Sequence, residues 1–109
     1  MITELINQNG NFIIAFDNIY GSGWDDDLIK IVIEKINPPS IVKNVIETGW
    51  YYSEKEFNIE KDNVQFILHL DDESSAYLRL LSSMTESNKQ KLRGWATIIA
   101  SEVEKLKGS

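Results

Sequence analysis

The spacing of apolar residues near the C-terminus predicts one long helix more clearly than any other element. Apolar side chains recur there at intervals of three and four residues, the period of a helix with one buried face, at Leu92, Trp95, Ala96, Ile99, Val103 and Leu106. Two capping-box patterns precede this stripe, one from Ser83 to Glu86 and one from Ser87 to Gln90. The helix is therefore predicted to begin near one of these serines.

Alternating apolar and polar residues fill the middle of the chain and predict an antiparallel sheet. Segments 42–52, 55–60, 64–70 and 76–82 are separated by turn-forming residues. In the third segment the even-numbered residues from Val64 to Leu70 are all apolar, which predicts one packed face and one wetter face. We expect a single α+β domain over residues 1–109, in which an antiparallel β-meander packs against the C-terminal helix in two layers.

The first third of the chain gives weaker patterns. Residues 2–8 are predicted to form a short helix, residues 12–16 an interior strand, and residues 17–23 a loop. Residues 24–36 fit two elements, because Trp24, Leu28 and Ile31 follow helical spacing while Ile29, Ile31 and Ile33 alternate as in a strand. A helix is favoured, since three aspartates suit its N-terminus and Pro38 follows its predicted end.

Composition limits the class of protein. The 109 residues fit one globular domain, with 42% hydrophobic and 26% charged residues. The absence of cysteine excludes disulfides and thiolate metal sites. The N-terminal residues do not resemble a signal peptide, and no apolar run approaches the length of a membrane helix, so we expect a soluble cytoplasmic protein that does not engage a membrane.

The net charge of −6 is concentrated in two acidic triplets. These are Asp25, Asp26 and Asp27, directly after Trp24, and Asp71, Asp72 and Glu73. The chain has 17 acidic and 11 basic residues, and the six acids of the triplets account for the whole difference. Such gathered carboxylates favour a basic partner protein and disfavour nucleic acid. The structural alternatives are a helix N-terminus for the first triplet and a solvated hairpin turn for the second.

Candidate catalytic and metal-binding patterns are weak. His69, the single histidine, shares a strand face with Asp71, and such a pair can support general base catalysis. Ser74 is near in sequence, but no nucleophile-elbow motif is present. The adjacent side chains of Asp25, Asp26 and Asp27 diverge, unlike the alternating ligands of a calcium loop. We therefore expect no catalytic residues, no cofactor and no metal site.

Aromatic residues supply candidate contacts beside the acids. Trp24 precedes the first triplet, and Tyr51 lies in a Trp-Tyr-Tyr run within the predicted strand 42–52. Aromatic side chains are enriched at interaction hot spots. For Tyr51 a core position and an interface position are about equally consistent with its neighbours.

In size, charge and composition the chain resembles the immunity proteins that neutralise bacterial toxins, particularly those of contact-dependent growth inhibition systems. This resemblance implies a cognate toxin domain as partner, often a basic nuclease, blocked by tight association. The residues expected to contact it are Trp24, Asp25, Asp26, Asp27, Tyr51, Asp71, Asp72 and Glu73. Two alternatives stay open: an acidic secretion chaperone for an effector protein, and a small enzyme that uses His69 and Asp71. The oligomeric state is not predicted.

Overall fold

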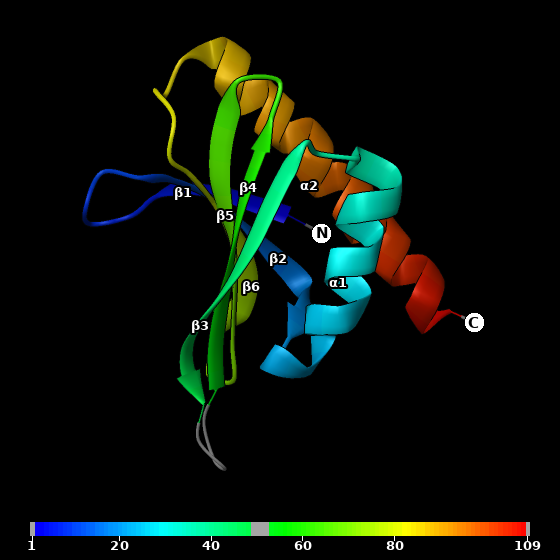
Figure 1. The fold of residues 1–109 in the computed structure, drawn as a ribbon. Coiled ribbons are helices and arrows are strands. Elements are labelled where there is room, and N and C mark those ends of the chain that lie inside the picture. The colour runs from blue at the N-terminus through cyan, green and yellow to red at the C-terminus, as the bar shows by residue number, and fades with distance from the viewer. Residues whose placement is uncertain (1, 49–52, 109) are drawn as a thin grey trace.

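The computed structural model describes residues 2–48 and 53–108, which form a sheet covered on one face by helices (Figure 1). The strands are β1 (Ile2–Ile6), β2 (Phe12–Tyr20), β3 (Ser40–Thr48), β4 (Ser53–Lys61), β5 (Val64–Asp71) and β6 (Ser75–Leu80). The helices are α1 (Asp25–Ile31) and α2 (Glu86–Lys107). A short 3-10 turn, η1 (Ser22–Trp24), leads into α1, and a π-helical turn, η2 (Val32–Ile36), continues it.

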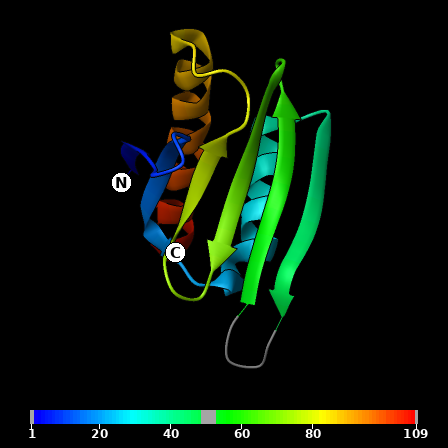
Figure 2. The same cartoon turned by 90° about the vertical axis from the view of Figure 1, so that its left-hand side faces the viewer.

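Within the described residues the six strands form one antiparallel sheet in the order β1-β2-β6-β5-β4-β3. Strands β3 to β6 follow one another as a meander, and β2 pairs with the last strand of it. Figure 2, turned by 90°, shows the strands side by side with both helices behind them. The predicted two-layer α+β fold is confirmed.

The core lies between the helix-covered face of the sheet and α2. The even-numbered residues of β5 from Val64 to Leu70 are fully buried, as their alternation predicts. Trp95 of α2 stacks on Phe66 with ring centroids 5.1 Å apart. Every residue of the predicted helical stripe is buried except Leu106, which is 47% exposed. The apolar periodicity thus identified the face of α2 that packs on the sheet.

The predicted N-terminal helix over residues 2–8 is wrong, because this segment begins with the edge strand β1. It pairs with β2 through the backbone from Ile2 opposite Phe16 to Ile6 opposite Phe12. Ile6 is 55% exposed, so β1 has little of the buried face that makes a strand recognisable. The turn that follows is closed by Asn7, whose Oδ1 accepts hydrogen bonds from the backbone N–H of Asn9 and of Asn11.

Other boundaries differ less from the prediction. β2 continues to Tyr20, so most of the expected loop over residues 17–23 is strand, and Ile19 within it is fully buried. Residues 24–36 are helical, as favoured, and end at Asn37 in the left-handed conformation with φ of 54°. The helix α2 begins after neither serine, because Thr85 is its N-cap and accepts a hydrogen bond from the N–H of Asn88.

The face of the sheet away from the helices carries its own half-buried layer. In the described part of the chain no helix packs on this face, which Figure 1 shows on the side opposite α1 and α2. Ile13 and Ile67 are nevertheless only 7% and 6% exposed. His69 and Asp71 of β5 point to the same face and are also buried. Polar side chains at this depth need partners, which β4, β5 itself and the turn after β5 supply.

Candidate functional site

Both acidic triplets lie at one end of the sheet, where β4 begins and β5 ends. The strand register places Glu54 opposite Asp71, the first acid of the second triplet. The turn η1, which leads into the first triplet, contacts β4 and β5 at the same end. Figure 2 shows the start of α1 beside the turn between β5 and β6. We call this region, with residues 25–27 and 71–73, the acidic end.

Asp25 is the inward-facing member of the first triplet. Its Oδ2 lies 2.7 Å from Lys55 Nζ of β4 and 3.0 Å from Lys43 Nζ of β3. Burial alone would raise the pKa of this carboxyl, but the hydrogen bonds and positive charges of Lys55 and Lys43 outweigh it and hold the pKa below its ordinary value of 3.8. Asp25 therefore ties α1 to the sheet.

Asp71 is the inward-facing member of the second triplet, and it organises the turn into β6. Its Oδ1 accepts hydrogen bonds from the N–H of Glu73 at 2.8 Å and of Ser74 at 2.7 Å. Burial would raise the pKa of Asp71, yet the hydrogen bonds from His69, Glu73 and Ser74 lower it below 3.8. A buried carboxylate with this many donors is fixed in position.

The outward-facing acids of the two triplets are exposed. They are Asp26, Asp27, Asp72 and Glu73. Asp72 Oδ2 accepts a hydrogen bond from the N–H of Ser53 at 2.8 Å, which joins the second triplet to the start of β4. Asp27 also borders a shallow hollow between α1 and α2 that contains residues of both charges. Four of the six predicted acidic contact residues are thus exposed to solvent. They lie on backbone segments that the contacts of Asp25 and Asp71 fix in place.

The two predicted aromatic contacts have different outcomes. Trp24 is half-buried against the core, and Lys107 Nζ of α2 lies 5.7 Å from the centroid of its ring. In sequence it directly precedes the first triplet. Tyr51 lies outside the described residues, between the paired ends of β3 and β4 at Thr48 and Ser53.

His69 sits among carboxylates on the open face beside the acidic end. Its Nδ1 lies 2.9 Å from Glu56 Oε2, and its Nε2 lies 2.8 Å from Asp71 Oδ2. Glu54 Oε1 is 3.8 Å from Nε2. We call Glu54, Glu56, His69 and Asp71 the His69 cluster. The ring of Tyr77 on β6 stacks on the imidazole, with centroids 4.5 Å apart and planes inclined by 14°.

The charges of this cluster affect the pKa of the neighbouring Tyr77. Burial raises the pKa of Tyr77; the charge of Arg79 opposes this, while the carboxylates of Glu56, Asp71 and Glu54 add to it. Tyr77 thus lies between the positive charge of Arg79 and the negative charges of the cluster.

Ser74 has a structural role in this arrangement. Its Oγ donates to Asp71, 3.0 Å from each carboxylate oxygen, so it braces the turn. A nucleophile–base pair would instead place the serine hydroxyl on the histidine. The predicted His69–Asp71 contact is confirmed, and its geometry is that of a braced turn.

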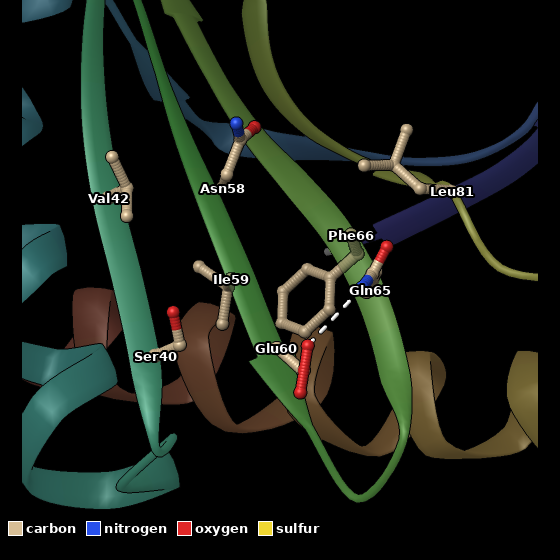
Figure 3. Close-up of a pocket in the computed structure, with 8 residues that line it drawn as sticks. All are labelled: Ser40, Val42, Asn58, Ile59, Glu60, Gln65, Phe66 and Leu81. Carbon is tan, nitrogen blue, oxygen red and sulfur yellow. Dashed lines mark hydrogen bonds between the residues drawn. The ribbon is translucent and has the colours of Figure 1, made fainter.

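A shallow pocket of about 300 Å³ lies at the other end of the sheet, near the turn between β4 and β5 (Figure 3). Val42 and Leu81 contribute exposed apolar surface to it. Glu60 is the one ionisable group among its described lining residues, and it accepts a hydrogen bond from Gln65 Nε2 at 3.2 Å. The pocket has no cluster of reactive groups comparable to that around His69.

Sequence reasoning did not identify Lys43, Lys55, Glu54 or Glu56 as neighbours of the triplets. The alternation of β4 does place Glu54 and Glu56 on one face and Lys55 on the other. What it leaves open is the register with β5, which sets the residues opposite them.

No family model matches the sequence, and the searches of curated proteins and of solved structures found no similar protein. Over residues 2–48 and 53–108, neither helix combines the length and apolar character needed to cross a membrane.

Proposed function

We propose that this protein is an immunity protein of the cytoplasm, which binds a cationic toxin domain and blocks its active site. The observation that supports this function is the gathering of both acidic triplets at one end of the sheet. The catalytic clefts of nucleases carry positive charge to hold phosphates. An anionic protein surface can occupy such a cleft and can be steered into it by long-range attraction.

The support beneath the exposed acids favours tight binding. Asp25 is anchored to Lys43 and Lys55, and Asp71 is anchored by the backbone of its own turn. Asp26 and Glu73, next to these anchors, are therefore held on ordered backbone. A surface that is ordered before binding loses less conformational entropy when the complex forms. Trp24, half-buried beside the first triplet, offers apolar area at the margin of the same surface.

The test begins with the proteins encoded beside this one in its genome. Each neighbouring reading frame is expressed alone and together with this chain, and growth is measured. We expect one neighbour to be toxic alone, to be tolerated in the presence of this chain, and to co-purify with it as a stable complex. If no neighbour is toxic, or if a toxic neighbour neither binds this chain nor is neutralised by it, the proposal fails.

A further inference from the structure

We propose that Glu54, Glu56 and His69 form a binding site for a divalent transition-metal ion, with Zn²⁺ as the best fit. One donor atom from each of these three side chains lies within 4.8 Å of the others. The ligands of one zinc ion lie about 2 Å from it and hence up to about 4 Å apart. Glu56 already lies at Nδ1, whereas Glu54 Oε1 lies 3.8 Å from Nε2, so closing the site requires the Glu54 side chain to swing toward the Nδ1 side of the ring.

The hydrogen-bond capacity of His69 is the strongest argument. A neutral imidazole has one N–H donor and one lone pair. Both ring nitrogens of His69 nevertheless lie within 2.9 Å of a carboxylate oxygen, on Glu56 and on Asp71. With a neutral ring, one of these contacts sets a lone pair against an anion, which is repulsive. The repulsion is removed either by a second ring proton, which would then donate to that carboxylate, or by a cation that the nitrogen and the carboxylate bind together.

The position of Asp71 indicates which nitrogen faces the metal. Its Oδ1 is held by two backbone N–H groups, and its Oδ2 lies 2.8 Å from Nε2. Histidines that bind metals through one nitrogen commonly donate the other N–H to a carboxylate, which fixes the tautomer and the ring orientation. Asp71 is thus a positioning residue for Nε2–H, and Nδ1 points its lone pair toward Glu56.

The setting of the cluster is suited to metal binding. The Tyr77 ring, stacked on the imidazole, limits its rotation. The side chain of His69 is 6% exposed, whereas those of Glu56 and Glu54 are 18% and 28% exposed. The histidine ligand is therefore held rigidly, and the glutamates leave coordination positions that water can reach. One imidazole with two carboxylates favours Zn²⁺ over Mg²⁺ or Ca²⁺, which prefer oxygen ligands alone.

Because the chain has one histidine, its imidazole gives a single pair of nitrogen signals in a histidine-labelled NMR sample. The protein is treated with EDTA, exchanged into metal-free buffer at neutral pH and titrated with ZnCl₂. We expect binding of one equivalent, with Nδ1 shifting to the value of a metal ligand while Nε2 stays protonated. An imidazole that remains protonated on both nitrogens in excess Zn²⁺ would show that a proton fills the site and would overturn the proposal.

Calorimetry on matched variants gives an independent readout. The variants Glu56→Gln and Glu54→Gln are each expected to weaken Zn²⁺ binding by a factor of about ten or more. Glu60→Gln, on the same strand and the same face at the far end of β4, is expected to leave binding unchanged. Equal affinities for the wild-type protein and both cluster variants would place the ion elsewhere and refute the site. This test needs no toxin, so its outcome is separate from that of the proposed function.

Discussion

Lys55 Nζ lies 2.7 Å from Asp25 Oδ2 and joins two segments 30 positions apart in sequence, the first residue of α1 and the third of β4. Lys43 of β3 completes the contact from the neighbouring strand. The most inward acid of the first triplet is thus an anchor between the two layers. Its neighbour Asp26 is exposed on the backbone that this anchor holds.

Asp25→Asn is expected to lower the free energy of unfolding by about 1–2 kcal/mol at pH 7. The variant keeps the shape of the side chain but removes the charge that pairs with Lys43 and Lys55. The loss is moderate because both lysines are partly exposed and can be hydrated. Urea denaturation measures it. Asp26→Asn is the matched control and should change stability by less than about 0.5 kcal/mol.

The effect of Asp25→Asn is also expected to depend on pH. The folded protein holds the pKa of Asp25 below its ordinary value of 3.8. Its stabilising contribution is therefore complete above that value and is lost as the pH falls through the lower, folded-state pKa. The stability difference between wild type and variant should shrink below pH 3.8. A difference that stayed constant into the acid range would contradict the ion-paired role of Asp25.

Asp71→Ala is expected to cost about 1–3 kcal/mol, because it leaves the partly buried donors of the β5–β6 turn without their acceptor. These donors include the N–H groups of Glu73 and Ser74. Thermal denaturation followed by circular dichroism measures the effect. Glu73→Ala, an exposed change in the same turn, should be nearly neutral. Equal losses in the two variants would show that the turn does not depend on the Asp71 carboxylate.

Thr85→Ala is expected to cost about 1 kcal/mol, since Thr85 Oγ1 accepts from the N–H of Asn88 at the start of α2. The sequence offers Ser83 and Ser87 as alternative caps. Ser83→Ala and Ser87→Ala are therefore the controls, and each should change the free energy of unfolding by less than about 0.5 kcal/mol. A larger loss of stability in either serine variant would indicate that this serine, and not Thr85, caps the helix.

The sequence was sufficient for the elements that bury an apolar face. The α2 stripe around Trp95 and the alternation from Val64 to Leu70 are both such patterns, and both were predicted correctly. β1 was missed because backbone pairing with β2 holds it while Leu5 and Ile6 remain largely exposed. A strand stabilised mainly through its backbone leaves little trace in hydrophobic periodicity.

The acidic triplets were found from composition. Which acid of each triplet is buried and which acids are exposed could not be found in this way. Asp25 and Asp26 are adjacent and chemically identical, and only the tertiary positions of Lys43 and Lys55 separate a buried anchor from an exposed acid. The His69 cluster has the same origin, because the register of β4 against β5 sets Glu56 opposite His69. Cross-strand register is fixed by the whole sheet and cannot be taken from one strand alone.

The association rate between this protein and the toxic neighbour that the proposed function requires tests the central claim most directly. The double variant Asp26→Lys/Glu73→Lys alters the acidic end, and Glu60→Lys/Asp62→Lys alters the opposite end. Each variant replaces two acids by lysines and so changes the net charge from −6 to −2. Stopped-flow measurements over a range of salt concentrations are made after circular dichroism has shown that both variants fold. We expect the first variant to slow association about tenfold or more at low salt and the second to have a much smaller effect. Equal rates for the two variants would contradict binding through the acidic end.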